Sequence, residues 1–177
     1  KAGSNLNKNE IYDRLRERFD LFGMDTNRVL NSYPIQLTAG ERQRSVIGIS
    51  TLLNPQMVIA DEPTSALDVS TQKEVIKMIF DLLDKGIFST MIFITHELPL
   101  LYHVADNIAI MYAGEIVEKG TAEQVVKDPR HPYTQALMGA MLSTEQSQRT
   151  RKPVAIEGAP PSLKKAIVGC RFADRCA

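Results

Sequence analysis

The chain has 177 residues, which is enough for one domain with a core of its own. Apolar residues make up 44% and charged residues 24% of it, an ordinary balance for a globular protein, and 21 basic residues offset 21 acidic ones. The zero net charge argues against nucleic-acid binding through bulk charge, and no apolar run approaches the ~20 residues of a membrane-spanning helix.

Two helices are expected in the first third of the chain. The first begins near Glu10 and ends at Gly23, because apolar residues recur at helical spacing between them. The second is expected from Glu41 to Leu53, and its apolar side consists of Val46, Ile49, Leu52 and Leu53. Thr38 and Gly40 stand at its N-terminus, where free N–H groups and the helix dipole suit a phosphate. An ordinary helix cap explains these two residues equally well.

A short strand is expected at 57–60, where four apolar residues run directly into Asp61 and Glu62. Pro63 ends the run, because proline has no N–H for a sheet ladder. Such a run is typical of a buried strand in a parallel sheet, and ligands collect at the C-terminal edge of such sheets. Asp61 could there hold Mg²⁺ and Glu62 could orient a water molecule. The alternative is a surface turn that carries two acids.

A helix and a second strand follow. Residues 72–85 alternate apolar and charged positions at helical spacing, with a capping-box pattern at Thr71 and Glu74, and residues 90–95 form an apolar strand that ends at His96. A strand, a helix and a strand in this order predict a βαβ unit with parallel strands. His96 should then lie at the same sheet edge as the two carboxylates. By itself, a histidine in this place is more often structural than catalytic.

The remaining residues predict a hairpin and two helices before a polar tail. Residues 106–120 read as two strands joined at Ala113-Gly114, and a capped helix begins at Thr121. Another helix starts with Pro132 in its first turn. Residues 143–153 are polar and are expected to be a linker.

Several stretches resemble one family, the ABC-type ATPases. Residues 57–68 resemble its Walker B motif and D-loop, and residues 37–41 (Leu-Thr-Ala-Gly-Glu) resemble its signature motif, which is usually Leu-Ser-Gly-Gly-Gln. His96 stands where the family has its switch (H-loop) histidine. The tail after residue 131 resembles the C-terminal extension of the ATPases of oligopeptide and dipeptide importers.

The resemblance implies an α/β fold, namely a partial P-loop NTPase of the ABC type with a helical subdomain and a C-terminal extension. Residues 1–55 would belong to the helical subdomain with the signature motif, 56–130 to the C-terminal half of the ATPase core, and 131–177 to the peptide-importer-type extension. The sequence contains no Gly-x-x-x-x-Gly-Lys-Ser/Thr phosphate loop. We therefore expect this chain to be a fragment of a longer ATPase and to bind Mg-ATP poorly by itself.

The resemblance also implies the site residues. Glu62 and His96 would be catalytic, and Asp61 would help to hold Mg²⁺. Six residues would contact the nucleotide: Thr38, Ala39, Gly40, Glu41, Ser65 and Asp68. Three of these depart from the usual signature: Thr38 keeps the hydroxyl of the usual serine, whereas Ala39 adds a Cβ and Glu41 brings a negative charge near a phosphate. We hypothesise that the charge of Glu41 slows hydrolysis or weakens closure of the ATPase dimer.

The implied protein is the ATP-hydrolysing subunit of a membrane importer for peptides, with ATP and Mg²⁺ as cofactors. It would be a peripheral subunit at the cytoplasmic face of the cell membrane. Its partners would be a second ABC ATPase subunit, identical or paralogous, transmembrane permease subunits and, indirectly, a substrate-binding protein, but no nucleic acid. Some members of this family bind an iron–sulfur cluster in the extension, which would here involve Cys170 and Cys176, although a four-iron cluster normally needs four thiolates.

Two other functions are considered. A non-catalytic interaction module with an ABC-like shape would account for Ala39, Glu41 and the absent phosphate loop, but not for the intact Asp61-Glu62 pair and His96. A soluble, non-transport ABC ATPase that acts on nucleic acid or ribosomes is disfavoured by the neutral charge and by the importer-type tail.

Overall fold

The structure is a computed structural model that describes residues 7–97, 101–102, 104–142, 156–164 and 166–176. The chain divides into two compact units, Lys1–His96 and Glu97–Ala177, and each is described by itself. The linker expected at 143–153 lies outside the described residues. Within the described ranges, no helix combines the length and the apolar character needed to cross a membrane.

The first unit begins with three helical segments. Helix α1 spans Lys8–Leu21 and begins slightly before the predicted Glu10, because Asn7 and Glu10 form a capping box around its first turn. Gly23 follows its end with a φ of +63°, a conformation that favours glycine. Helix α2 (Thr26–Leu30) and the 3₁₀ turn η1 (Pro34–Gln36) are too short to show a hydrophobic period, and they were not predicted.

Helix α3 spans Ala39–Ser50 and begins two residues before the predicted start, because Thr38 caps it. It contacts α1 through Gly48, where an added Cβ would lie 2.7 Å from a ring carbon of Phe19. The side that the sequence identifies as apolar is instead largely exposed: Val46, Ile49 and Leu53 are 57%, 62% and 50% exposed. A close approach of the two helices therefore depends on a glycine and not on the large apolar residues.

The predicted strand–helix–strand unit is confirmed. Strand β1 (Met57–Asp61) pairs in parallel with β2 (Thr90–Ile94), and the long helix α4 (Val69–Asp84) connects them. The α4 residues Val75, Ile79 and Leu82 are at most 3% exposed and form the centre of the core of this unit. The predicted capping box at Thr71 and Glu74 is wrong, because α4 begins earlier and Asp68 caps it.

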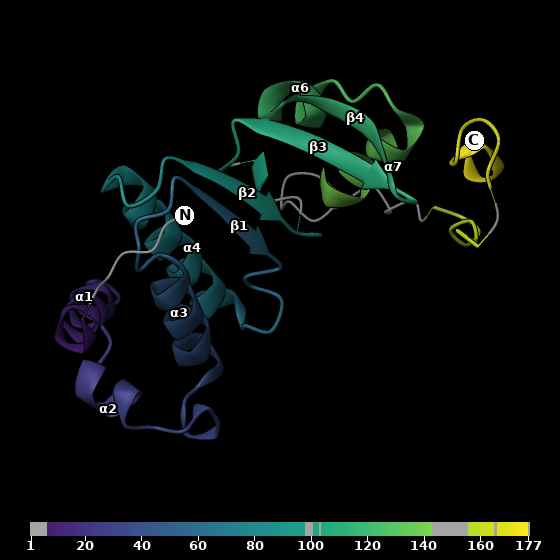
Figure 1. Ribbon diagram of the computed structural model, residues 1–177. Helices are drawn as coiled ribbons and strands as arrows, with labels where there is room; N and C mark the ends of the chain where they lie inside the picture. The colour runs from purple at the N-terminus through teal and green to yellow at the C-terminus, as the bar shows by residue number, and fades with distance from the viewer. Residues whose placement is uncertain (1–6, 98–100, 103, 143–155, 165, 177) are drawn as a thin grey trace. The chain divides into compact units, whose positions relative to one another are not determined.

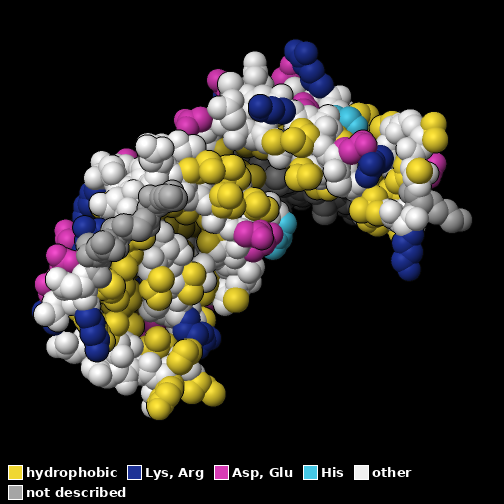
Figure 2. Space-filling view, in the orientation of Figure 1, with side chains coloured by type: hydrophobic (Ala, Val, Ile, Leu, Met, Phe, Trp, Pro, Cys, Tyr) yellow, Lys and Arg dark blue, Asp and Glu magenta, His cyan; other side chains and the backbone are white. Residues whose placement is uncertain are grey.

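The prediction that β1 is a buried strand holds for only one of its faces. Val58 of β1 and Met91 and Phe93 of β2 pack on the core, on the side where α3 and α4 lie in Figure 1. The opposite face is open, and four apolar side chains there are 46–61% exposed: Met57, Ile59, Ile92 and Ile94. Hydrophobic side chains accordingly gather over β1 and β2 in Figure 2.

The second unit is built on the predicted hairpin. Strands β3 (Asn107–Tyr112) and β4 (Glu115–Thr121) are antiparallel, and Ala113 and Gly114 form the turn with φ of +49° and +85°. Buried and exposed residues alternate along β3. Its buried side packs with α6 (Ala122–Lys127) and with residues of α7 (Pro132–Leu142).

The C-terminal segment packs on the turn of this hairpin. Phe172 is 2% exposed, and its ring lies 5.2 Å from the ring of Tyr112 and 5.5 Å from that of Tyr133. Arg171 donates a hydrogen bond to the carbonyl of Ala113. Arg175, in the 3₁₀ turn η3 (Ala173–Arg175), donates to the Tyr112 hydroxyl at 3.1 Å. The tail is therefore part of the packed structure of the second unit.

Candidate functional site

Two acidic residues, Asp61 and Glu62, stand at the C-terminal end of β1, as the sequence predicts. The pairing register places Asp61 opposite Ile94, the last residue of β2. The N–H of Glu62 then donates to the carbonyl of Ile94 at 2.9 Å, which extends the ladder by one residue. Glu62 itself has a φ of +46°, a left-handed conformation that is uncommon for residues other than glycine. Backbone strain of this kind is concentrated at functional sites.

His96 lies beside Glu62, as expected from the parallel strands. Its Nδ1 is 2.8 Å from Oε1 of Glu62, and the side chains are 72% and 35% exposed. The second carboxylate oxygen of Glu62, Oε2, is buried and accepts no hydrogen bond from the residues that the structure describes. A partly exposed carboxylate that is oriented by an imidazole can take a proton from, or polarise, a water molecule.

The turn after Glu62 is held by Ser65. The Ser65 hydroxyl donates to the Glu62 carbonyl at 3.1 Å, and its N–H lies 3.3 Å from the same oxygen. Thr64, between them, is fully buried. In this structure Ser65, which the family resemblance assigns to the nucleotide, binds the backbone of the proposed catalytic glutamate.

The signature-like turn is a complete capping box at the start of α3. Thr38 Oγ1 accepts a hydrogen bond from the N–H of Glu41 at 3.2 Å, and Glu41 Oε2 accepts one from the N–H of Thr38 at 2.9 Å. The other carboxylate oxygen of Glu41 forms an ion pair with Arg28. The negative charge that the sequence brings to this turn is therefore partly compensated, and a glutamine could close the same box.

Asp68 caps α4 with its carboxylate. It accepts from the N–H groups of Ser70 and Thr71, each at 3.1 Å, and from the Thr71 hydroxyl at 2.6 Å. The Thr71 hydroxyl is the main reason that the pKa of Asp68 lies below its ordinary value. Asp68 is therefore an ionised helix cap at the exposed start of α4.

Contacts in the structure join the predicted site residues into two groups. Glu62, His96 and Ser65 are linked around the end of β1, beside Asp61. Gly40 of the signature-like turn is buried against Thr71, which binds Asp68. Ala39, the first residue of α3, is partly exposed.

Sequence reasoning did not identify Arg28 as a functional residue, and it gave Thr71 only a capping role. Arg28 lies in α2, a helix that the sequence does not predict, so no periodic pattern links it to Glu41. The signal for Thr71 was present in its spacing from Asp68, because a hydroxyl three residues after an N-cap can return to the cap.

Cys170 and Cys176 are both exposed and have free thiols. Among the residues that the structure describes, no three His, Cys, Asp or Glu side chains come close enough to hold a metal ion. A four-iron cluster normally needs four thiolates. The described part of the tail therefore does not fit such a cluster by itself.

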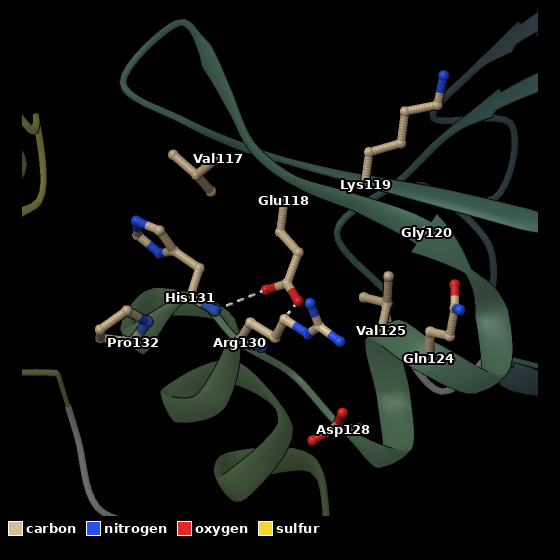
Figure 3. Close-up of a pocket in the computed structure, with 10 residues that line it drawn as sticks. All are labelled: Val117, Glu118, Lys119, Gly120, Gln124, Val125, Asp128, Arg130, His131 and Pro132. Carbon is tan, nitrogen blue, oxygen red and sulfur yellow. Dashed lines mark hydrogen bonds between the residues drawn. The ribbon is translucent and has the colours of Figure 1, made fainter.

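A separate hollow of about 610 Å³ lies in the second unit, between β4, α6 and the start of α7. Its central acid is Glu118, which points toward the N–H groups of Arg130 and His131 in Figure 3 and accepts from them at 2.8 and 3.0 Å. Partial burial acts to raise the pKa of Glu118, but these hydrogen bonds keep that pKa below its ordinary value. Glu118 thus joins β4 to the start of α7, which is a structural role.

Comparisons with known proteins connect these features to one family. Residues 2–65 match the family described as ABC transporter, and residues 117–177 match the family described as oligopeptide/dipeptide transporter, C-terminal region. Among solved structures, cbiO1 from Clostridium perfringens, described as part of the ABC transporter complex cbiONQ, is similar with a TM-score of 0.59. That likeness has 26% sequence identity and covers 71% of this chain and 49% of the other. It confirms the predicted partial ABC-type ATPase fold.

Curated relatives are transport ATP-binding proteins. The dipeptide transport ATP-binding protein DppD of Caldanaerobacter subterraneus subsp. tengcongensis is 38% identical over 174 residues, which cover 98% of this chain and 52% of that protein. The oligopeptide transport ATP-binding protein OppD of Bacillus subtilis is 42% identical over 172 residues, covering 96% of this chain and 47% of that protein. The chain spans about half the length of these relatives. Over almost all of its length it is therefore similar to about half of the length of the ATP-binding proteins of oligopeptide and dipeptide ABC transporters.

Proposed function

We propose that this chain is part of an ATP-hydrolysing subunit that drives peptide import through a membrane ABC transporter. The observation that carries the proposal is the pair formed by Glu62 and His96, 2.8 Å apart, directly after two parallel strands in a chain similar to these ATP-binding proteins. In this proposal, the whole protein consists of this chain and a preceding segment that carries the phosphate loop. The chain's length, about half that of its relatives, supports such a segment.

The chemistry of each side chain suggests its role in the site. Glu62 would polarise the attacking water through its partly exposed carboxylate. With the proton on Nδ1, His96 donates to Glu62 Oε1, orients the carboxylate and would also steady the γ-phosphate. Thr38, Ala39, Gly40 and Glu41 would reach the nucleotide held by a second ATPase subunit, and Ser65 and Asp68 would belong to the loop that communicates across this dimer.

Asp61 is the residue that would help to hold Mg²⁺. Mg²⁺ prefers oxygen ligands and is usually bound by one or two carboxylates together with substrate phosphates. The exposed Asp61 carboxylate beside Glu62 fits this donor set, and the described residues contain no complete metal site that would compete with it. When bound, Mg²⁺ neutralises the charge of the ATP phosphates.

The exposed side of the β1–β2 pair supports the presence of further chain. Four half-exposed apolar residues lie on one face of two neighbouring strands. Contiguous apolar surface of this kind usually marks an interface. We propose that the phosphate-loop segment of the whole protein covers it. The domain assignments 1–55, 56–130 and 131–177 belong to the same proposal.

The partners follow from the family. The whole protein would pair with a second ABC ATPase subunit and dock on transmembrane permease subunits at the cytoplasmic face of the membrane. An iron–sulfur cluster at Cys170 and Cys176 would require further thiolates besides these two. Iron analysis and visible absorption of anaerobically purified whole protein test the cluster, and an iron-free, colourless sample counts against it.

The experiment that tests the function is ATP hydrolysis by the whole protein with Glu62→Gln. The substitution keeps the shape of the side chain but removes the base, so we expect turnover to fall about 100-fold or more while a nucleotide-bound dimer accumulates. Glu74→Gln, on the exposed side of α4, is the matched control and should hydrolyse ATP normally. Unchanged turnover in Glu62→Gln would remove Glu62 as the base and would favour a non-catalytic interaction module.

A further inference from the structure

Thr71 touches both the signature-like turn and the Asp68 loop. Its hydroxyl donates to Oδ2 of Asp68 at 2.6 Å. Its methyl carbon, Cγ2, lies only 2.7 Å from the place where a Cβ on Gly40 would stand. One small side chain in the first turn of α4 thus contacts two motifs that are 28 positions apart along the chain, counted from Gly40 to Asp68.

The contact gives a specific reason for a glycine at position 40. Gly40 is buried in the first turn of α3, and it is not among the residues with a positive φ. The family resemblance suggests a glycine because of its permissive backbone, but a helical residue does not need that freedom. The requirement here is space, because an alanine Cβ would overlap with the methyl group of Thr71.

Thr71 also limits how Asp68 can be oriented. Two backbone N–H groups donate to Oδ1 of Asp68, and the Thr71 hydroxyl donates to Oδ2. A helix cap needs only the N–H bonds. The additional bond from the Thr71 hydroxyl fixes the Asp68 carboxylate relative to the Thr71 methyl group, which packs on Gly40.

We propose that Thr71 is a positioning residue that sets the spacing between the Thr38–Glu41 turn and Asp68. With this spacing, both can contact the nucleotide site of a partner subunit at the same time. This role rests on the proposed function. Misplacement of such groups by about 1 Å can lower activity by about 100-fold, so a direct side-chain spacer between them matters. The ligand is the nucleoside triphosphate held between two subunits.

Two substitutions separate the two contacts of Thr71. Thr71→Ser keeps the hydroxyl and removes the methyl group, whereas Thr71→Val keeps methyl groups and removes the hydroxyl. Gly40→Ala tests the spacing from the other side, and the double variant Gly40→Ala/Thr71→Ser makes room for the new Cβ. Ser70→Ala is the matched control in the same turn, because Ser70 binds Asp68 through its N–H.

The assay uses the whole protein in the Glu62→Gln background and measures the ATP concentration for half-maximal dimer formation. We expect Thr71→Val and Gly40→Ala to raise it about tenfold, Gly40→Ala/Thr71→Ser to recover most of that loss, and Ser70→Ala to have no effect. ATP binding to the monomer and the melting temperature are measured alongside, since a purely structural role would lower the melting temperature without shifting dimer formation of the folded protein.

The outcomes distinguish this inference from the function on which it rests. If the Glu62→Gln parent forms no dimer with ATP, both the function and the role of Thr71 are overturned. If the parent forms the dimer and all the variants form it at the same ATP concentration, only the role of Thr71 is overturned. A Gly40→Ala defect that the second substitution leaves unchanged would contradict the direct contact.

Discussion

The two pairs of strands in this chain differ in how they are covered. In the β3–β4 hairpin, three residues of β3 (Ile108, Ile110 and Tyr112) are 4–5% exposed, because α6, α7 and the C-terminal tail supply partners from the same unit. In the β1–β2 pair no residue is fully buried, and one face remains open. The covered pair carries structural contacts and the open pair carries the proposed chemistry. The proposed interface with further chain and the proposed catalytic residues therefore lie on the same two strands, β1 and β2.

The largest expected effect is on ATP hydrolysis, and it tests whether the catalytic residues lie in the first unit only. His96→Ala should lower ATP turnover of the whole protein about 100-fold or more, because Glu62 loses the group that orients it. His131→Gln, in the second unit, should leave turnover near that of the parent. Steady-state ATPase assays at saturating ATP measure both, and equal loss in the two variants would break the assignment of the chemistry to the first unit.

The next effect concerns the stability of the covered hairpin. Phe172→Ala removes a ring that is 2% exposed and packed on Tyr112 and Tyr133, and should cost the second unit about 3–5 kcal/mol. Val168→Ala is the control, because Val168 is 98% exposed. Hydrogen exchange of the β3 and β4 amides should become faster in the first variant only. Unchanged exchange in Phe172→Ala would mean that the tail does not stabilise the hairpin.

A pH effect is expected at the start of α4. Because the pKa of Asp68 is lowered in the folded state, its carboxylate stabilises the fold above the ordinary aspartate pKa of about 4. This contribution is lost as the pH falls through the lowered pKa. In Asp68→Asn the acid-dependent loss should disappear, and in Thr71→Val the pKa of Asp68 should rise toward its ordinary value. Carbon NMR titration of the Asp68 carboxyl measures the shift, and an ordinary pKa in the parent chain contradicts the cap.

The smallest effect is expected for Glu41→Gln. Glutamine can still close the capping box with Thr38, and the lost ion pair with Arg28 is partly exposed, so stability should change by less than about 1 kcal/mol. Since Arg28 already compensates the charge, we expect the ATPase rate to change little. A markedly faster Glu41→Gln enzyme would instead support the hypothesis that this charge slows hydrolysis.

Sequence patterns predicted the elements whose signals are local. The apolar run before Asp61, the period of α4 and the Ala113-Gly114 turn each depend on neighbouring residues, and the structure contains all three. The parallel pairing then brought His96 to Glu62 as expected.

Most of the failures have a common physical cause, because they depend on contacts between distant segments. The pairing of Arg28 with Glu41 and the approach of Thr71 to Gly40 have no periodic signature. The exposure of Ile59 could not be foreseen either, since an apolar run predicts burial without saying which segment provides it. The cap of α4 is a separate, local failure, because Asp68 caps the helix three residues before the predicted Thr71.

The most direct test of the central claim is calorimetric titration of Mg-ATP into this chain and into the whole protein. If the phosphates are held by a segment outside this chain while Asp61, Glu62 and His96 act on the bound nucleotide, the whole protein should bind one ATP per subunit and this chain should bind weakly. Tight, stoichiometric binding by the chain of 177 residues alone would contradict the account.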